Sequence, residues 1–410
     1  MISVEEALAR ILSQITSLPA ITVSLTDAQG LILAEDIIAQ EDMPPFDNSA
    51  MDGFALLSQD SIQKADQVPR LRVTGGVAAG YVTDHRVESG TAMRIMTGAP
   101  VPLGADTIIQ VELTRHDGPE STWVEILQEV QPGNNIRPAG QDMRRGQKIL
   151  TQGTELGPWE IGILATLGWS RVAVIRKAQV AILGTGDELV DIDQPLQPGK
   201  IRNSNSYLLE AAVRRAGAEP HRLGVARDTV ESLREKFAEA VTFDLIITSG
   251  GVSVGDFDLV KNIMAEQGEV NFWRINMKPG KPVAFGRIGG TPLLGLPGNP
   301  VSSAVTFELF TRPVIRKLQG HRLLVKPLVE VSLQDDILDK AMRRHYVRAY
   351  VEWQDGQFVA RTTGNQDSHI MTSLLHANAF VIIPEGSVSP HAGDTFTALM
   401  LEWPEVATWD

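Results

Sequence analysis

Between residues 178 and 320, short apolar runs alternate along the chain with amphipathic segments. Residues 180–183 and 245–247 are apolar runs of the length that buried strands have, whereas residues 206–216 and the segment that starts at Asp228 carry helix signals. Strands that alternate with helices form parallel sheets covered on both faces. The pattern therefore predicts an α/β domain here, and we expect the chemistry of the protein to lie in it.

Two other regions show short strands separated by turns. One covers residues 55–150 and is typical of a small β-barrel or sandwich, and the other follows Pro313. In the second region, Asp355-Gly356 is a strong signal for a hairpin turn. Each region is therefore predicted to form an all-β domain. The expected strands are residues 71–74, 92–96, 107–111, 123–127, 328–333, 346–353 and 358–363.

Two short helices are predicted outside these regions. Ser3 and Glu6 have capping-box spacing at the start of a helix over residues 3–16, and Pro158 is tolerated in the first turn of a helix over residues 155–168. The whole chain is therefore predicted to be a multidomain protein of the α/β plus all-β class. The expected domains are a helical and linker domain at 1–45 and 140–176, a small β domain at 46–139, the α/β domain at 177–325 and a C-terminal β domain at 326–410.

Composition narrows the classes of function. The chain has 410 residues, and its hydrophobic fraction of 43% is typical of a globular protein. The net charge of −13 disfavours nucleic acid and anionic lipid as partners, and no apolar run approaches the ~20 residues that span a bilayer. The absence of cysteine excludes disulfides and thiolate-ligated zinc or iron–sulfur clusters. Together with an acidic start that lacks a signal-peptide pattern, these features predict a cytoplasmic protein that binds neither nucleic acid nor membrane.

Three glycine-rich turns follow strands of the predicted α/β domain, at residues 184–188, 249–255 and 295–303. Because open α/β sheets bind ligands at the carboxyl ends of their strands, we expect the three turns to form one cleft. Free N–H groups in such turns bind anions. The turns match neither the Walker sequence nor the dinucleotide fingerprint, since Leu189 stands where the fingerprint needs its third glycine. These mismatches disfavour Walker-type ATP use and NAD binding.

Acidic residues accompany these turns. Asp256 and Asp258 lie just past the second turn, and Glu188 ends the first one. Carboxylates beside an anion site favour a bridging Mg²⁺ ion. Asp228 has two interpretations, because a helix N-cap at this position would stabilise the protein by ~1 kcal/mol, whereas a metal ligand would point into the cleft. The spacing alone favours the N-cap.

Basic residues that could bind an anion occur in two places. Lys278 and Lys281 flank a Pro-Gly turn, so both ammonium groups could converge on one oxyanion, and the alternative is a solvated turn. In the last domain, Arg344 and Arg348 share one face of a predicted strand, where surface exposure is the default. Ser368 could donate a hydroxyl hydrogen bond or shape a turn.

The segment 41–54 contains two consecutive prolines, which exclude regular secondary structure. Loops of this kind in compact proteins often carry function. Asp47 is interpreted as a turn former, and for Asp52 a turn and a functional role are equally favoured. The eight histidines show no metal-ligand spacing, so His369 is interpreted, like the others, as an ordinary surface or core residue.

Taken together, these motifs resemble the molybdopterin molybdenumtransferases, the family of bacterial MoeA and the gephyrin E domain. The matching motifs occur in the family's order and span nearly the whole chain. They are residues 46–54, 94–100, 184–189, 249–256, 278–282 and 296–302. The resemblance implies a central three-layer α/β molybdopterin-binding domain with flanking β domains, in an elongated homodimer.

The resemblance also implies a reaction. The family inserts molybdenum from molybdate into adenylylated molybdopterin and releases molybdenum cofactor and AMP, with Mg²⁺ as the cofactor. Cations and hydroxyls suit molybdate, which is a tetrahedral dianion, and Mg²⁺ would offset charge on the pyrophosphate. By resemblance, molybdate would be held by Lys278, Lys281, Arg348 (preferred to Arg344), Ser302 and Ser368, and Mg²⁺ by Glu188, Asp228 and Asp258.

Further roles follow from the same resemblance. The residues implied to be catalytic are Lys278, Lys281, Glu188, Asp52 and Asp142. Substrate-binding roles are implied for Thr97, Gly250, Gly251, Ser253, Pro297 and Pro300. In the family's dimer, Asp52, Thr97 and Asp142 reach the cleft from the second subunit.

Two other functions stay open. A molybdopterin adenylyltransferase has a related α/β domain but usually needs that domain alone, so the flanking β regions disfavour it. A non-catalytic, gephyrin-like scaffold would not need Lys278, Lys281 and Glu188 together. Family logic further predicts contact with the adenylyltransferase and with other proteins of the molybdenum cofactor pathway.

Overall fold

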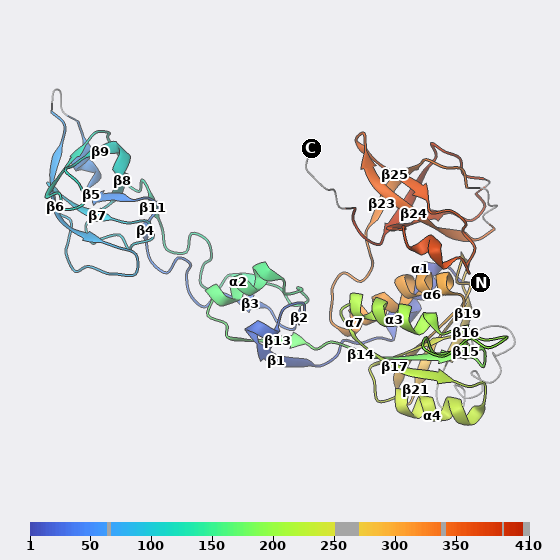
Figure 1. Ribbon diagram of the computed structural model, residues 1–410. Coiled ribbons are helices and arrows are strands. Elements are labelled where there is room, and N and C mark those ends of the chain that lie inside the picture. Colours follow the sequence, from blue (N-terminus) through green and yellow to red (C-terminus); the bar gives the residue numbers. More distant parts are fainter. Residues whose placement is uncertain (64–66, 251–269, 338–341, 388, 405–410) are drawn as a thin grey trace. The chain divides into compact units, whose positions relative to one another are not determined.

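The computed structural model describes residues 1–63, 67–250, 270–337, 342–387 and 389–404 (Figure 1). The chain divides into two compact units. The first, here called the core unit, contains Met1–Glu35, Gly153–Ile161 and Ser170–Asp410. The second, here called the β unit, contains Asp36–Gln152 and Gly162–Trp169. The four domain boundaries expected from the sequence stay a prediction.

A mixed six-stranded sheet forms the centre of the described part of the core unit. In sheet order its strands are β17 (Glu219–Ala226), β14 (Gln179–Thr185), β18 (Leu245–Ser249), β22 (Thr291–Leu296), β21 (Pro282–Ile288) and β19 (Val270–Arg274). The first four run parallel, as predicted. The expectation of a purely parallel sheet is wrong at the other edge, because Gly289-Gly290 joins β21 to β22 as an antiparallel hairpin and β19 pairs antiparallel with β21.

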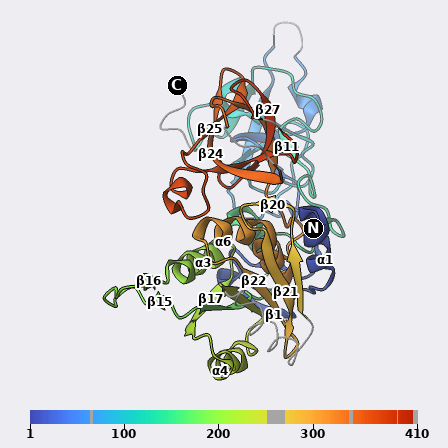
Figure 2. The same cartoon turned by 90° about the vertical axis from the view of Figure 1, so that its right-hand side faces the viewer.

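Helices cover both faces of this sheet, which confirms the predicted three-layer arrangement (Figure 2). Leu233 and Phe237 on the inner side of α4 (Val230–Ala240) pack against one face. The helices on the opposite face are α1 (Val4–Ser13), α3 (Ser204–Arg215), α6 (Pro300–Thr306), the π-helical turn η4 (Phe307–Thr311) and α7 (Arg312–Leu318).

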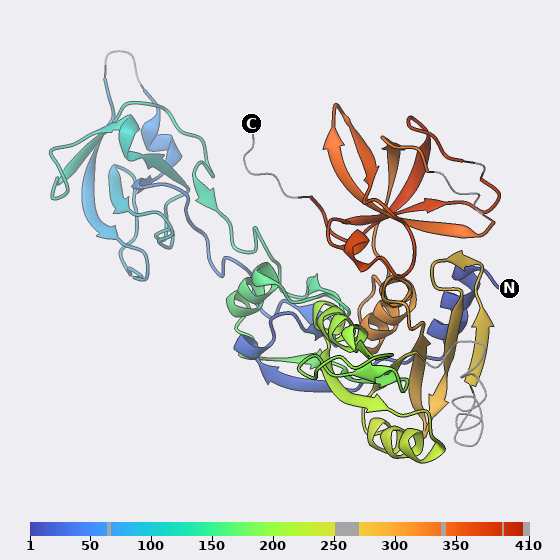
Figure 3. The same cartoon turned by 45° about the vertical axis from the view of Figure 1, so that its right-hand side comes forward.

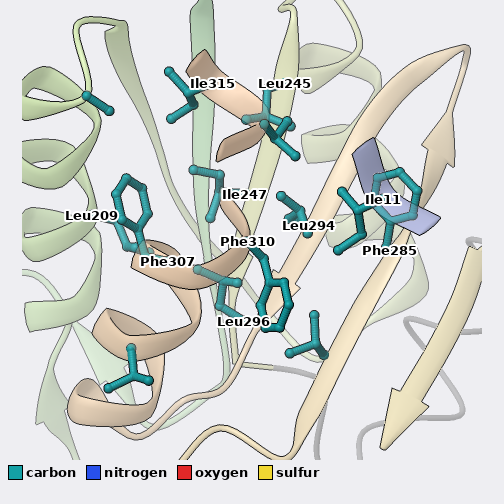
Figure 4. Close-up of a cluster of buried hydrophobic side chains, with 14 of the residues drawn as sticks. Ile11, Leu209, Leu245, Ile247, Phe285, Leu294, Leu296, Phe307, Phe310 and Ile315 are labelled. Atoms are coloured by element: carbon teal, nitrogen blue, oxygen red, sulfur yellow. The ribbon is translucent and has the colours of Figure 1, made fainter. Parts of the chain in front are cut away.

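Apolar side chains from the two central strands meet the helices in a continuous core (Figure 4). Ile247 of β18 and Leu296 of β22 are fully buried, and so are Phe307 and Phe310 opposite them. Each such side chain contributes roughly 1.5–3 kcal/mol by leaving water. This packing holds the carboxyl ends of β18 and β22 rigidly beside the start of α6.

The N-terminal helix belongs to this core. Ser3 caps α1 by accepting a hydrogen bond from the Glu6 N–H at 3.0 Å, as the sequence predicted, although the helix ends at Ser13 rather than at residue 16. Its buried residues Ala7 and Ile11 pack in the same cluster as the central strands. Residues 4–13 therefore support the α/β fold.

The C-terminal region of the core unit is a closed five-stranded barrel in the described residues (Figure 3). Its strands pair in the cyclic order β24 (Arg344–Gln354), β25 (Gln357–Thr362), β23 (Leu328–Leu333), β27 (Thr395–Met400) and β26 (Ala379–Ile383). β24 and β25 form the hairpin predicted at Asp355-Gly356. The short strand β20 (Met277–Lys278) pairs with β24 and ties the barrel to the α/β sheet.

Smaller elements complete the core unit. A three-stranded sheet has the order β1-β13-β2, and two short parallel strands pair between β14 and α3. The bounds are β1 (Ala20–Ser24), β2 (Ile32–Leu33), β13 (Arg171–Ile175), β15 (Leu189–Val190), β16 (Ile201–Arg202), η1 (Leu25–Asp27) and η5 (Met371–Leu374). The predicted helix at 155–168 is α2 (Pro158–Thr166), which begins in the core unit and belongs to the β unit from Gly162 on.

The β unit is built of strands, as predicted. A six-stranded sheet carries one apolar cluster around Phe54 and Ile109 and a second around Met93 and Ile108. In sheet order its strands are β8 (Thr107–Gln110), β5 (Gly53–Leu56), β7 (Thr91–Ile95), β6 (Arg70–Val77), β10 (Trp123–Ile126) and β9 (Thr114–Arg115). The other elements are β3 (Ile37–Ile38), β4 (Asn48–Ser49), β11 (Ile136–Arg137), β12 (Lys148–Leu150), η2 (Ser58–Ser61) and η3 (Val111–Leu113).

None of the helices in the described ranges has both the length and the apolar character that crossing a bilayer requires.

Candidate functional site

The three glycine-rich turns lie together at one end of the central sheet. β18 pairs in parallel with β14 on one side and with β22 on the other, so all three strands end at the same edge. A cavity of about 540 Å³ opens there. Its wall includes Gly186 from the first turn, Gly250 from the second and Pro297 from the third, which confirms the predicted convergence.

Gly250 lets the second turn pass very close to the first. Its φ is +91°, and a Cβ atom at this position would lie 2.7 Å from the carbonyl oxygen of Thr185. Its N–H also donates to the carbonyl of Leu296, at 3.1 Å. Glycine is needed here because the conformation disfavours other residues and leaves no space for a side chain. The backbone at Gly250 thus joins the ends of all three strands.

Two of the three predicted Mg²⁺ ligands face the cavity. Glu188 and Asp228 both contribute to its wall, and the carboxylate of Glu188 folds over Gly186. Mg²⁺ in nucleotide sites is usually bound by one or two carboxylates together with substrate phosphates, so this pair fits such an ion. In the described ranges, no cluster of three or more acidic or histidine side chains is placed to hold a metal by itself.

Asp228 is not the N-cap of the following helix. Thr229 is the N-cap of α4, and its hydroxyl accepts a hydrogen bond from the Ser232 N–H at 3.2 Å. The N-cap interpretation of Asp228 is therefore wrong, because the helix begins one residue later than the capping-box spacing indicated. Asp228 is exposed and its N–H donates to the Asp187 carboxylate. Its side chain is thus not used for capping.

Several predicted site residues lie outside the described ranges. They are Gly251, Ser253, Asp256 and Asp258, which belong to the second glycine-rich turn and the segment after it. Their roles stay a prediction.

The predicted lysine pair lies beside α6. A Cβ atom at Gly280, between the two lysines, would be 2.6 Å from Cγ2 of Thr306 and 3.6 Å from the carbonyl oxygen of Ser302. The turn is thus packed tightly on that helix, and Pro282, the residue after Lys281, lines the cavity. Neither lysine is among the described residues that form the cavity wall, but Lys281 directly precedes one that is.

The start of α6 brings more predicted residues to the same place. Pro300 and Ser302 line the cavity from the first turn of this helix. Asn299, just before it, donates from Nδ2 to the hydroxyl oxygen of Ser368 at 2.8 Å. The Val301 N–H also donates to the carbonyl of Ser368. A loop of the C-terminal barrel is therefore fixed against the cavity.

Arg348 is completely buried beneath this loop. Its Nε donates to the Ser373 hydroxyl at 3.2 Å and its Nη2 to the Asp367 carbonyl at 3.4 Å. Burial lowers the pKa of Arg348 to about 10, with partial compensation from the charge of Asp367, so the side chain stays cationic at neutral pH. Its Nη1 is buried and has no hydrogen-bond partner in the described residues.

A buried donor without a partner is costly, so Nη1 of Arg348 favours a missing ligand, although Arg348 does not itself line the cavity. Arg344, the alternative, forms an ion pair with Glu5 of α1 instead. The preference for Arg348 over Arg344 stays a prediction. It is supported by the unpartnered Nη1 of Arg348 and by the ion pair that already engages Arg344.

Asn205 and His369 are among the cavity residues that the sequence reasoning missed. Asn205, in the first turn of α3, donates from Nδ2 to the Ser249 hydroxyl at 2.8 Å and to the Gly298 carbonyl at 2.7 Å. One amide thus joins the second and third turns, and the polar run at residues 203–206 was its signal. His369, interpreted as an ordinary residue, lies in the cavity wall, and no spacing in the sequence distinguishes it.

Asp52 and Thr97 meet in the β unit. The N–H and the hydroxyl of Thr97 both donate to Oδ1 of Asp52, at 2.7 and 2.8 Å. These two bonds hold the pKa of Asp52 below its ordinary value, and the bond from the backbone N–H has the larger effect. Asp142 is exposed in the same unit. Asp47 accepts a bond from the distant Ala139 N–H, so it joins two loops rather than shaping its own turn.

Replacing Thr97 with valine is expected to raise the pKa of Asp52 partway to its ordinary value. The hydroxyl donor is lost, while the backbone donor, which is the larger cause, remains. Because folding lowers this pKa, the stabilisation is present above the unfolded pKa and is lost as pH falls through the folded one. Carboxyl ¹³C titration measures the shift, and Thr97→Ser is the matched control. An unchanged pKa in the valine variant would show that the hydroxyl bond is not formed.

Family models match almost the entire chain. Residues 2–168 match the MoeA N-terminal region (domain I and II), residues 181–317 match a probable molybdopterin binding domain, and residues 330–401 match the MoeA C-terminal region (domain IV).

Curated relatives match over nearly their whole length. The chain is 37% identical to a molybdopterin molybdenumtransferase of Haemophilus influenzae, over 97% of this chain and 98% of the relative. It is 39% identical to the molybdopterin molybdenumtransferase 2 of Mycobacterium tuberculosis, over 96% of this chain and 98% of the relative. A crystal structure of a molybdopterin biosynthesis MoeA protein from Pyrococcus horikoshii OT3 is 31% identical with a TM-score of 0.83, covering 98% of this chain and 100% of that one.

Proposed function

The chain belongs to the molybdopterin molybdenumtransferase family, and we propose that it inserts molybdenum from molybdate into adenylylated molybdopterin, with release of molybdenum cofactor and AMP. One observation carries this proposal. A single cavity has the carboxylates of Glu188 and Asp228 and the hydroxyl of Ser302 in its wall, and the lysine turn and the loop of Ser368 pack at α6 beside it. A substrate with a pyrophosphate and a second, oxyanionic substrate need these two environments side by side.

The nucleotide part of the substrate is assigned to the carboxylate wall. Glu188 and Asp228, together with Asp258, would hold Mg²⁺, which would supply positive charge at the pyrophosphate when bound. Other backbone N–H groups of the glycine-rich turns would bind phosphate oxygens, whereas those of Gly186 and Gly250 already donate to Ala226 and Leu296. Gly250 and Pro297 would keep this wall close to the substrate, and Gly251 and Ser253 belong to the same turn.

Molybdate is assigned to the region around α6. Lys278 and Lys281 would supply point charges, and Ser302 and Ser368 would donate hydroxyl hydrogen bonds. Arg348 would add its unpartnered Nη1 from beneath the loop that carries Ser368. The contacts of this loop with Asn299 and Val301 support the assignment, since they bring groups of the barrel and the α/β domain to one place.

The β unit is assigned a role in an elongated homodimer. Asp52, Thr97 and Asp142 would complete the cleft of the partner subunit, and the Asp52–Thr97 pair fits such a role because it is exposed and already ordered by two hydrogen bonds. We further propose a cytoplasmic protein that receives its substrate from the molybdopterin adenylyltransferase and passes its product to other proteins of the pathway.

A pair of reactions tests the proposal against its two alternatives. The chain is incubated with adenylylated molybdopterin, Mg²⁺ and molybdate, and separately with molybdopterin and Mg-ATP. The proposal predicts AMP release in the first reaction and no adenylylation in the second. Adenylylation in the second would favour the adenylyltransferase, and no reaction in either would favour the non-catalytic scaffold.

The Mg²⁺ assignment predicts the effect of removing one carboxylate charge at a time. Glu188→Gln and Asp228→Asn are each expected to raise the Mg²⁺ concentration that gives half-maximal AMP release by about tenfold, because a metal ligand has lost its charge. Glu235→Gln, at an exposed carboxylate of α4 that does not line the cavity, is the matched control. An unchanged Mg²⁺ requirement in both site variants would remove these residues from the metal site.

A further inference from the structure

Asn299 is a cavity residue with no role in the assignments above. It stands at the N-cap position of α6, where a side chain would ordinarily accept a bond from the helix, yet it makes no such bond. Its Nδ2 reaches across to Ser368 on the C-terminal barrel instead, at 2.8 Å from the hydroxyl oxygen. The side chain therefore serves the loop of the barrel rather than its own helix.

The direction of this hydrogen bond decides what Ser368 can do. An amide N–H can only donate, so the hydroxyl oxygen of Ser368 must accept, and its own proton stays available for another acceptor. Within the described ranges, the hydroxyl of Ser368 makes no other hydrogen bond. Molybdate oxygens are acceptors, so a hydroxyl held in this state is suited to donate to them.

Two further hydrogen bonds hold the loop in addition to the one from Asn299. The Val301 N–H donates to the carbonyl of Ser368 at 3.3 Å, and Nη2 of Arg348 donates to the carbonyl of Asp367 at 3.4 Å. Both bonds involve the loop backbone and would persist if the Asn299 side chain were truncated. The contribution of Asn299 is thus confined to the orientation of one hydroxyl.

We propose that Asn299 is a positioning residue that keeps the hydroxyl of Ser368 as a donor toward the molybdate oxyanion. This inference rests on the proposed function, in which Ser368 contacts molybdate. An aspartate at position 299 has the same shape but can only accept, so it would capture the proton of Ser368 and place a negative charge beside the dianion. An alanine would merely free the hydroxyl to rotate.

The test compares four variants by the molybdate KM of AMP release at saturating adenylylated molybdopterin. They are Asn299→Asp, Asn299→Ala, Ser368→Ala and the double variant Asn299→Ala/Ser368→Ala. Asn365→Asp is the control for added charge: Oδ1 of Asn365 accepts from the Asp367 N–H in the same loop, and an aspartate keeps that bond. Thermal unfolding checks that each variant is folded.

We expect Asn299→Asp to raise the molybdate KM by about tenfold or more and Asn299→Ala by about threefold, with little change at Asn365→Asp. The double variant should match Ser368→Ala, since Asn299 acts through that hydroxyl. A folded Asn299→Asp with native KM, or single effects that multiply in the double variant, would overturn the inference while leaving the proposed function intact. If the native chain itself showed no molybdate-dependent release, the proposed function and the inference would fall together.

Discussion

Replacing Lys281 with alanine is expected to reduce molybdate-dependent AMP release by about 100-fold or more, the size of effect seen when a preorganised donor to a developing oxyanion is removed. Lys281 is held at the cavity edge by a turn that packs on α6 and leads into Pro282 of the cavity wall. Its ammonium group would offset negative charge on molybdate. Water that replaces the side chain in the alanine variant carries no positive charge, so this stabilisation would be lost.

The comparison that isolates this effect uses two further variants. Lys281→Arg keeps the charge but changes its shape, so partial activity is expected. Lys236→Ala removes a partly exposed lysine of α4 that pairs with Glu239 on the same helix, and should leave the rate unchanged. Native rates in Lys281→Ala, measured over a range of molybdate concentrations, would remove Lys281 from the anion site.

Replacing Gly250 with alanine is expected to destabilise the core unit and to abolish activity. The left-handed conformation costs a non-glycine residue roughly 1–2 kcal/mol, and the contact of Cβ with the Thr185 carbonyl adds overpacking of about 1–3 kcal/mol. Relief of that contact requires the second turn to move away from the first, which would open the wall of the cavity. Urea denaturation measures the loss of stability, and AMP release measures the loss of function.

Gly290 provides the matched control for Gly250. It has a similar φ of +89° in the β21–β22 hairpin, but a Cβ atom there would have no neighbour within 4 Å. Gly290→Ala should therefore show the conformational cost alone, roughly 1–2 kcal/mol, with activity retained. Equal losses of stability in the two variants would contradict a steric role for the approach of Gly250 to Thr185.

Sequence periodicity was sufficient for the elements that are buried on both faces or capped locally. Residues 245–247 form the first part of a fully buried strand, because a short apolar run of that length is stabilised by burial on both faces of a sheet. Ser3 caps its helix because the bond it makes is local. The convergence of the three turns followed from the parallel pairing of β14, β18 and β22.

The features that sequence periodicity did not predict depend on local backbone geometry or on contacts between distant parts of the chain. The antiparallel direction of β21 is set by the hairpin at Gly289-Gly290, and the pattern of apolar and polar residues does not predict strand direction. Asp228 and Thr229 both suit an N-cap, and which of them begins α4 is decided by backbone geometry. His369 comes to the cavity through the packing of the barrel loop on α6, where Asn299 bonds Ser368, a residue 69 positions later in the sequence. The residues assigned to the anion site were therefore accessible mainly through family resemblance.

The most direct measurement of the central claim is the amount of molybdenum incorporated into the pterin product, compared with the AMP released in the same reaction. Molybdate is titrated at fixed adenylylated molybdopterin and Mg²⁺, with the molybdenum content of the purified product determined by mass spectrometry. The account predicts that AMP and molybdenum-loaded product rise together in equal amounts and that both are absent without molybdate. AMP released at the same rate without molybdate would contradict it and identify a simple hydrolase.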